Sequence, residues 1–239
     1  DMNLFPKNVN FLSTERYLDG GKSIGNFENF NLALHVNDKR ENVLENRSIL
    51  KDYYGIPSNP IWINQTHSSI CVDASSTKKI AEADASFTIN PRVVCAVLTA
   101  DCLPVFVCKK DGSMVGIAHA GWKGLISGVI ESLIESFQCN GADLVAHLGP
   151  AISKNYFEVG IEIKDLYLSK NSNFARSFSF YRDKHYLDLY DAAKVILESF
   201  NITLTSGGDR CTFKESDKFF SYRRDGVNSG RMAHLIWMK

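Results

Sequence analysis

The sequence predicts an α+β fold in which mixed β-sheets are sandwiched between helices. Short apolar runs of strand length alternate with segments whose apolar residues recur at helical spacing. Hairpin signals, such as Asp111-Gly112, separate several of the runs. Interleaved helices together with hairpins predict mixed sheets with helices outside them. The 239 residues contain no repeat, low-complexity tract or linker, so we expect a single domain over residues 2–239.

The first predicted helix follows Asp38, which forms a capping-box pattern with Glu41. An apolar stripe after this pattern predicts a helix of about four turns that runs towards Tyr54. Gly55 and Pro57 are residues that end helices, so we expect the helix to stop there.

Strands are predicted where β-prone apolar residues cluster in short runs between turn residues. These runs are residues 61–63, 70–72, 93–99, 105–108, 114–119 and 144–148. Because Asp111-Gly112 lies between the fourth and fifth runs, these two strands are expected to form a hairpin.

Two later helices are predicted from apolar residues at helical spacing. The first covers residues 125–137, where Leu125, Val129, Leu133 and Phe137 share one face. The second covers residues 188–200. The final stretch, residues 219–238, mixes strand-like and turn-like pieces.

Composition excludes several classes of protein. Lys plus Arg equals Asp plus Glu, and a neutral chain argues against a nucleic-acid partner bound through its phosphates. No apolar run is long enough for a membrane helix, and residues 1–20 lack the apolar segment of a secretory signal, so we expect a cytoplasmic protein. Free thiols are then expected at the six cysteines. The oligomeric state stays open, with a homodimer as one option.

Three polar islands interrupt the apolar structure where predicted strands end: Gln65-Thr66-His67, Thr99-Ala100-Asp101-Cys102 and His119-Ala120-Gly121-Trp122. Strand ends and loops are where binding sites are usually built. His67, Cys102 and His119 offer two imidazoles and a thiolate, which zinc accepts, and three protein ligands leave a fourth position for water or substrate. Water bound there becomes a hydroxide nucleophile near neutral pH.

The same three side chains also fit roles that involve no metal. His67 could cap a turn, Cys102 could be one more buried thiol, and His119 could bond within its own turn. A cysteine nucleophile paired with either histidine needs no metal at all.

Two carboxylates and a glycine-rich turn add further candidates. Asp84 and Asp101 could perform acid–base chemistry or orient a ligand histidine. If its segment is extended, Asp101 points away from Cys102, which favours a supporting role. The turn from Gly121 to Gly124 precedes a helix whose N-terminus, helped by Lys123, could bind an anion. A plain tight turn is the simpler explanation and the one that we favour.

Arginines supply candidate contacts to an anion or a base. Arg47, Arg223, Arg224 and Arg231 are the candidates, and the last three lie in or just after the aromatic run at residues 219–226. Arginine beside aromatic rings could clamp a planar ligand, or it could form ion pairs over an aromatic core. Gln65 of the first island is a further candidate substrate contact.

The islands, in this order, resemble the YfiH-like family, also called the laccase-domain or polyphenol-oxidoreductase family. The resemblance covers nearly the whole chain. It rests on the segments at residues 46–47, 64–67, 83–85, 99–104, 119–124, 148–153 and 219–233. One departure is Ser229-Gly230-Arg231, where the family usually has Thr-Gly-Arg, and this change keeps the hydroxyl.

The resemblance implies a fold, a metal and an activity. It implies mixed sheets sandwiched between helices, similar to the catalytic domain of cytotoxic necrotizing factor toxins. It implies zinc ligands that carry over to His67, Cys102 and His119. It also implies phosphorolysis of adenosine, inosine, guanosine and methylthioadenosine, together with deamination of adenosine, so purine nucleosides and phosphate are the expected partners.

The older family name implies an alternative, a copper-dependent polyphenol oxidase. A coupled copper cluster that reduces oxygen needs many more histidines than the six present, and none of the six form an H-x-H pair. A single copper ion could still occupy the three-ligand site, because copper outcompetes zinc at many sites. A third hypothesis is a binding module with a structural metal and no catalytic activity.

Overall fold

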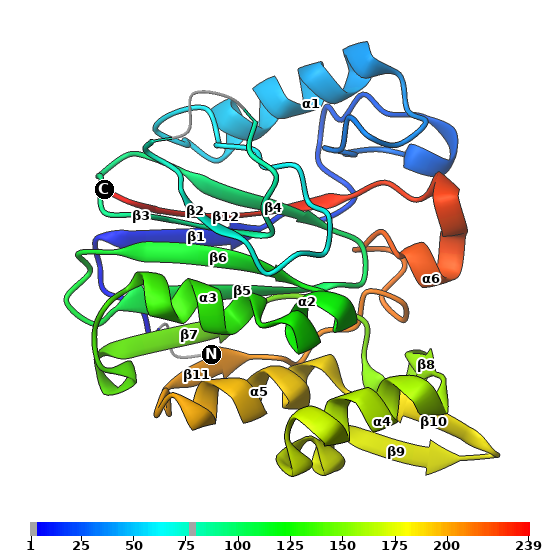
Figure 1. The fold of residues 1–239 in the computed structure, drawn as a ribbon. Coiled ribbons are helices and arrows are strands. Elements are labelled where there is room, and N and C mark those ends of the chain that lie inside the picture. The colour runs from blue at the N-terminus through cyan, green and yellow to red at the C-terminus, as the bar shows by residue number, and fades with distance from the viewer. Residues whose placement is uncertain (1–3, 77–79) are drawn as a thin grey trace.

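The structure is a computed structural model that describes residues 4–76 and 80–239. Its elements form four layers: a helix, a three-stranded sheet, a six-stranded sheet and a second layer of helices (Figure 1). Across these described residues, no helix is both long and apolar enough to cross a membrane. Mixed sheets between helices are the architecture that the sequence predicts.

The six-stranded sheet is antiparallel at its centre and parallel at both ends. Its strands lie in the order β11-β7-β5-β6-β3-β2. The parallel pairs are β2 with β3 and β7 with β11. The bounds are Cys71–Asp73 for β2, Ala85–Thr88 for β3, Leu103–Lys109 for β5, Val115–Ala120 for β6, Leu144–Leu148 for β7 and Thr205–Gly207 for β11.

The three-stranded sheet is antiparallel throughout and joins the two ends of the chain. It consists of β1 (Val9–Ser13), β12 (Met232–Met238) and β4 (Cys95–Thr99), in that order. One face packs against the six-stranded sheet through a shared apolar core. The other face packs against α1 (Arg40–Tyr53), where Leu50 is fully buried.

Three helices cover the outer face of the six-stranded sheet. They are α2 (Trp122–Ser127), α3 (Val129–Ser136) and α5 (Leu189–Ser199). Their apolar residues share the largest core of the molecule with β5, β6 and β7. The fully buried Leu125, Leu133 and Leu197 show that the predicted apolar faces are those that pack.

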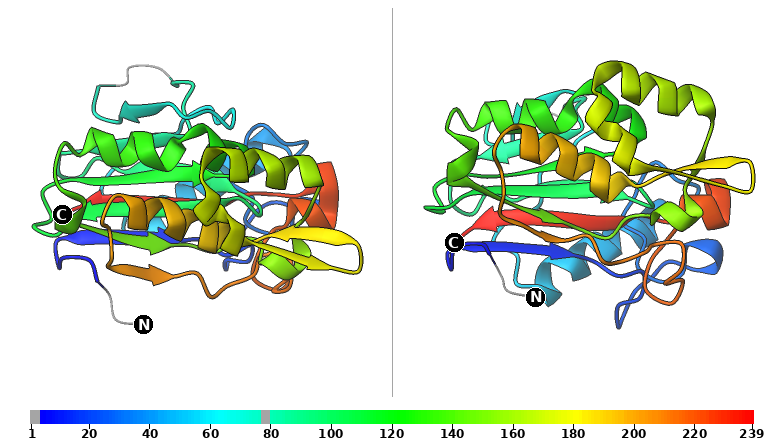
Figure 2. Two further views of the ribbon diagram at one scale, coloured as in Figure 1. Left: turned by 60° about the horizontal axis from the view of Figure 1, so that its bottom comes forward. Right: turned by 90° about the horizontal axis from the view of Figure 1, so that it is seen from below.

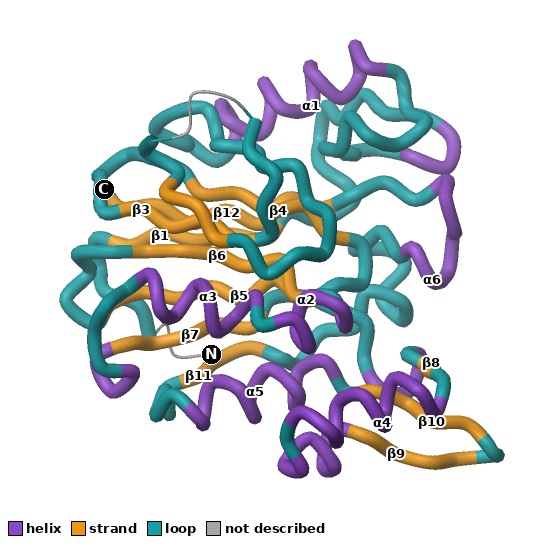
Figure 3. The backbone as a smooth tube through the Cα atoms, viewed as in Figure 1, coloured by secondary structure: helices purple, strands orange, loops and turns teal. Residues whose placement is uncertain are grey.

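A small third sheet projects from this body (Figure 2). It is formed by β8 (Glu158–Val159), β10 (Lys184–Leu187) and β9 (Phe178–Tyr181), and α4 (Ile161–Lys170) lies beside it. The short α6 (Tyr222–Asp225) follows β11 after a segment that is largely loop (Figure 3). The segment between β1 and α1 is also mostly loop.

Most predicted elements are present. The helix of about four turns, the Asp111-Gly112 hairpin, and the strands from residue 93 to 148 are confirmed as α1 and β4 to β7. The helix predicted at 188–200 is also confirmed, and the Asp188 carboxylate caps it by accepting from the N–H groups of Tyr190 and Asp191. The six cysteines, all within the described part of the chain, are free thiols as expected.

The capping box predicted at α1 is wrong. Lys39 is the N-cap residue, and no side chain caps the helix. The Asp38 carboxylate accepts instead from Ser23 Oγ at 2.6 Å and from Asn31 Nδ2 at 2.9 Å. Because Asp38 holds the loop before the helix, it does not reach the free N–H groups of the first turn.

Two other element predictions need correction. The single helix predicted at 125–137 is two helices, because Gly128 adopts a left-handed φ of 94° between α2 and α3. The strand predicted at 61–63 is reduced to one isolated bridge at Ile61. Beyond it, the side-chain amide of Gln65 makes both hydrogen bonds to the Leu98 backbone, which replaces strand pairing there.

Candidate metal centre and pocket

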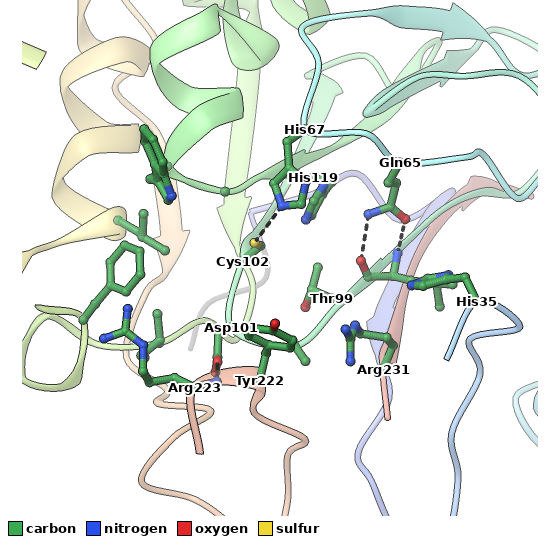
Figure 4. Close-up of a pocket in the computed structure, with 17 residues that line it drawn as sticks. His35, Gln65, His67, Thr99, Asp101, Cys102, His119, Tyr222, Arg223 and Arg231 are labelled. Atoms are coloured by element: carbon green, nitrogen blue, oxygen red, sulfur yellow. Dashed lines mark hydrogen bonds between the residues drawn. The ribbon is translucent and has the colours of Figure 1, made fainter. Parts of the chain in front are cut away.

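The three predicted metal ligands meet at one end of the central strands of the six-stranded sheet. His67 lies in the loop before β2, Cys102 lies between β4 and β5, and His119 lies in β6 (Figure 4). Their donor atoms are all within 4.8 Å of one another. Among the described residues, they form the one group of three or more His, Cys, Asp or Glu side chains close enough to share an ion.

Strand register explains why these residues meet. In the β5–β6 pair, Leu103 lies opposite Ala120, which brings Cys102 next to Gly121. A Cβ atom at Gly121 would lie 2.8 Å from Cys102 Sγ and 3.1 Å from His67 Cδ2. Only glycine therefore allows the chain after β6 to approach both ligands this closely.

Asp84 anchors two of the ligands. Its Oδ1 accepts from His119 Nδ1 at 2.8 Å, which leaves Nε2 of that ring as the metal-binding nitrogen. The same carboxylate accepts from the backbone N–H groups of Thr66, His67 and Ser68 at 3.1, 3.1 and 2.6 Å. His67 has a left-handed φ of 61°, and the bonds to Asp84 hold it in that conformation.

The charges of the cluster suit a metal ion. Burial alone would raise the pKa of the Cys102 thiol, but the charge of His119 and hydrogen bonds from His119 and His67 lower it to about 6. Burial would also raise the pKa of Asp84, but hydrogen bonds from His119 and Ser68 hold it at about 2. Cys102 is therefore mainly a thiolate at neutral pH, the form that binds metals.

His119 has a raised pKa for a related reason. Burial would lower its pKa, but the thiolate of Cys102 and the hydrogen bond to Asp84 raise it to about 9. A metal ion that binds Nε2 must therefore displace a proton, so metal affinity is expected to fall as the pH is lowered.

The geometry fits one small transition-metal ion. Bonds of about 2.1 Å to nitrogen and about 2.3 Å to sulfur let one ion bridge donors up to about 4.4 Å apart. Cys102 Sγ and His67 Nε2 are 3.9 Å apart, and the His67 and His119 rings meet edge to face at 4.8 Å between centroids. Small inward movements would close a three-ligand site, and the donor set suits zinc or copper.

A cavity of about 560 Å³ opens onto this cluster. That volume is in the range of sites that bind small organic molecules. Aromatic side chains and arginines form much of its wall. The residues that line it besides the three ligands are His35, Gln65, Leu98, Thr99, Ala100, Asp101, Gly121, Trp122, Ile152, Phe157, Leu189, Tyr222, Arg223 and Arg231.

Asp101 holds the opposite wall of the cavity rather than a metal ligand. Its carboxylate accepts from Thr212 Oγ1 at 2.6 Å, Ser221 Oγ at 3.0 Å and the N–H of Arg223 at 2.7 Å. These bonds place Tyr222 and Arg223 beside the cavity (Figure 4). Asp101 has a left-handed φ of 88°, so this turn is also held in an unusual conformation.

Two of the candidate arginines lie outside the set of lining residues. The Arg47 guanidinium donates twice to the Leu32 carbonyl, at 2.9 and 2.8 Å, and stacks 4.1 Å from the Trp62 ring. The Arg224 guanidinium donates to backbone carbonyls, among them that of Phe219 at 2.9 Å. The structure brings neither guanidinium to the cavity.

The remaining candidates divide in the same way. Gln65 and Arg223 line the cavity, but both ends of the Gln65 amide are bound to the Leu98 backbone at 2.8 Å. Lys123 is absent from the lining, and its Nζ lies 5.5 Å from the centroid of the Trp122 ring.

Several lining residues were not candidates from sequence, among them His35, Phe157 and Leu189. His35 lies in an exposed turn before α1, and Phe157 lies just before β8. Neither lies beside a polar island, so no local pattern in the sequence identifies them.

Comparisons with known proteins point to one family. A family model described as multi-copper polyphenol oxidoreductase laccase matches residues 11–239. A purine nucleoside phosphorylase of Haemophilus influenzae is 39% identical over 237 residues, which cover 98% of this chain and 96% of that protein. The purine nucleoside phosphorylase YfiH of Escherichia coli is 39% identical over 234 residues, covering 98% and 95%.

Solved structures show the same architecture. The Neisseria meningitidis protein NMB0706, described as a DUF152 protein, is 41% identical with a TM-score of 0.93, covering 99% of this chain and 96% of that one. YfiH of Bacillus licheniformis is 28% identical with a TM-score of 0.87, covering 97% and 93%. This chain therefore belongs to the YfiH-like family, whose family model is that of the multi-copper polyphenol oxidoreductase laccases.

Proposed function

We propose that this protein is a zinc-dependent purine nucleoside enzyme. Its reactions would be phosphorolysis of adenosine, inosine, guanosine and methylthioadenosine, and deamination of adenosine. The observation that carries the proposal is a three-ligand cluster at the edge of a cavity of about 560 Å³ that also contains aromatic rings and arginines. The names of the relatives, which are purine nucleoside phosphorylases, support the phosphorolysis part of the proposal.

In phosphorolysis, a phosphate oxygen forms a bond to the anomeric carbon of the ribose while the bond from that carbon to the base nitrogen breaks. The electron pair stays on the base, which takes up a proton, and the products are a free purine and ribose 1-phosphate. The walls suit such a substrate, because Trp122, Phe157 and Tyr222 offer faces for a planar base and arginines offer positive charge for phosphate.

In deamination, water adds to the purine carbon that bears the amino group, and ammonia leaves. A zinc ion at the cluster would supply the Lewis acid that activates such a water. Asp84 would keep the proton on Nδ1 of His119 and direct Nε2 at the ion.

The two carboxylates have positioning roles in this proposal. Sequence suggests acid–base chemistry for both, but Asp84 accepts from several donors of the ligand loop and Asp101 from three donors of the opposite wall. Arg223 and Gln65 are the candidate substrate contacts that line the cavity.

The test combines metal content with turnover. Protein purified without added metals is expected to carry about one zinc per chain. The zinc-loaded protein should convert adenosine to inosine without phosphate, and to free adenine and ribose 1-phosphate with phosphate. If no free base, ribose phosphate or inosine forms, the proposal is wrong.

Copper-dependent phenol oxidation is the second candidate, because two histidines and a cysteine also suit copper. It predicts oxygen uptake with phenols by protein that carries stoichiometric copper. Oxidation seen only with excess added copper would count against it.

A further inference from the structure

Arg231 is a half-buried cation without a carboxylate partner. None of the ion pairs found among the described residues includes it. Its Nη1 donates to the carbonyls of Ser229 and Gly230, whereas its Nε and Nη2 have no hydrogen-bond partner in the described part of the chain. Both nitrogens keep some exposed surface, because neither is among the fully buried polar atoms that lack a hydrogen bond in the described residues.

The surroundings of Arg231 carry charges of both signs, because burial lowers its pKa while the charges of Cys102 and Asp101 raise it. Burial lowers the pKa of His35, and the charges of Arg231, Arg47 and His119 lower it further. His35 and Arg231 line the same cavity, and Figure 4 shows them on one side of Tyr222. Arg231 forms no ion pair with a carboxylate of the described residues, so its charge is available to an anion at this end of the cavity.

Arg223 differs from Arg231 although both line the cavity. Figure 4 shows it on the other side of Tyr222. Its two terminal nitrogens donate to the carbonyls of Tyr156 at 3.3 Å and Glu158 at 3.2 Å, and its guanidinium lies 5.1 Å from the Phe157 ring. Arg231 also lies over a ring, 5.6 Å from the Tyr222 centroid, but only its Nη1 is bound to carbonyls. Because both terminal nitrogens of Arg223 are bound to carbonyls, its end of the cavity is better suited to a flat base than to a phosphate.

We propose that Arg231, assisted by His35, forms the binding subsite for the phosphate co-substrate, and that the Arg223–Phe157 end receives the base. The inference rests on the proposed function, because it places one substrate of that reaction. The free Nε and Nη2 of Arg231 can donate side by side to two phosphate oxygens, which is the favoured geometry between guanidinium and phosphate.

The experiment measures phosphorolysis of inosine by the zinc-loaded protein with phosphate and inosine varied separately. In Arg231→Gln, the KM for phosphate is expected to rise about tenfold or more, because a charge-assisted pair is lost. The KM for inosine should change less than about threefold, since the base lies at the other end. Arg231→Lys should recover part of the loss, because it keeps the charge but not the two-pronged geometry.

The controls separate this subsite from a general loss of activity. His35→Gln, a change in an exposed turn, should raise the KM for phosphate about two- to threefold. Arg182→Gln, at an exposed arginine of the projecting sheet, should change neither KM. Equal rises in both KM values for Arg231→Gln would overturn the inference. A phosphate KM that responds to Arg223→Gln and not to Arg231→Gln would also overturn it.

A binding readout keeps the inference separate from the proposed function. Inorganic phosphate is titrated into the zinc-loaded protein and followed by phosphorus NMR line broadening, with no nucleoside present. Phosphate binding that weakens about tenfold in Arg231→Gln supports the subsite, even if the wild-type protein turns over no nucleoside and the proposed function fails. Equal phosphate affinity in wild type and Arg231→Gln overturns the subsite, even if both proteins turn over inosine.

Discussion

Asp84 and Asp101 are both buried carboxylates beside the cavity, yet they organise opposite sides of it. Asp84 lies next to β3 and binds His119 of the adjacent strand β6 and the loop that carries His67. Asp101 lies between β4 and β5 and binds Thr212, which is 111 residues away in the chain. The first carboxylate serves the metal ligands, and the second serves the wall that faces them.

This difference teaches that a shared residue type and a shared pocket do not imply a shared role. Each carboxylate already accepts several hydrogen bonds from the protein, so neither is well placed to accept a proton from a substrate. What distinguishes them is the segment that each one immobilises. If this division of roles holds, changes on the Asp84 side should alter metal binding, and changes on the Asp101 side should alter nucleoside binding.

The largest effect is expected from removing a ligand on the metal side. Cys102→Ala leaves two histidines, so zinc content should fall to background and nucleoside turnover should be lost. The free energy of unfolding should fall only by about 1–2 kcal/mol, because Cys102 is half-buried and the change removes a single heavy atom. Metal analysis, the turnover assay and urea unfolding check this. An unfolded variant would favour a structural metal over a catalytic one.

Asp84→Asn is the next test, because it removes the charge that orients His119. The affinity for zinc should fall about 10- to 100-fold, as is typical when the partner of a ligand histidine is lost. The KM for nucleoside at saturating zinc should change little. Competition with a chelator measures the affinity. Unchanged zinc affinity would mean that Asp84 does not position the metal ligands, and the proposed difference between the two carboxylates would be wrong.

Asp101→Asn is the matched change on the other side. Its three donors lose a charged acceptor, so Tyr222 and Arg223 should be less well placed. We expect the KM for nucleoside to rise roughly tenfold, because small displacements of positioning groups are costly. Zinc affinity should remain that of the wild type. A loss of zinc in this variant would contradict the comparison.

The smallest effect at neutral pH concerns His234, which lies outside both networks. Its ring is fully buried and bonds to Thr99 Oγ1 at 2.8 Å and Ser13 Oγ at 2.7 Å. Burial, and then the charge of His119, lower its pKa to about 3. His234 is therefore protonated below about pH 6.5 in the unfolded chain, but only below about pH 3 in the folded chain.

Stability from this group is thus complete above about pH 6.5 and is lost as the pH falls towards 3. In His234→Gln, that part of the pH dependence should disappear. Urea unfolding of both proteins at pH 7 and pH 4.5 should show the difference between them shrinking by a few kcal/mol at the lower pH, at roughly 1.4 kcal/mol per pKa unit. A constant difference would mean that His234 is protonated in the folded state.

The elements that could be predicted from sequence are those specified by local patterns. The α5 face and its Asp188 cap follow from residues within a few positions of one another. Two of the three islands end strands, β4 and β6, because polar residues interrupt apolar runs there, and the resemblance assigned His67, Cys102 and His119 as ligands. Predictions failed where a distant partner took over a local role, as when Ser23 and Asn31 engaged the carboxylate of Asp38.

By itself, the sequence determined the α+β architecture, the apolar faces that pack and the residue types that could bind a metal. The tertiary structure decided which of the candidates meet. It directed Asp84 to His119, Asp101 to the segment around residues 212–223, and the Arg47 guanidinium to a backbone carbonyl, leaving Arg231 at the cavity. The physical reason is range, because periodicity and capping act over a few residues, whereas these hydrogen-bond partners come from segments far apart in the chain. The register of β3 with β6, for example, brings Asp84 beside His119.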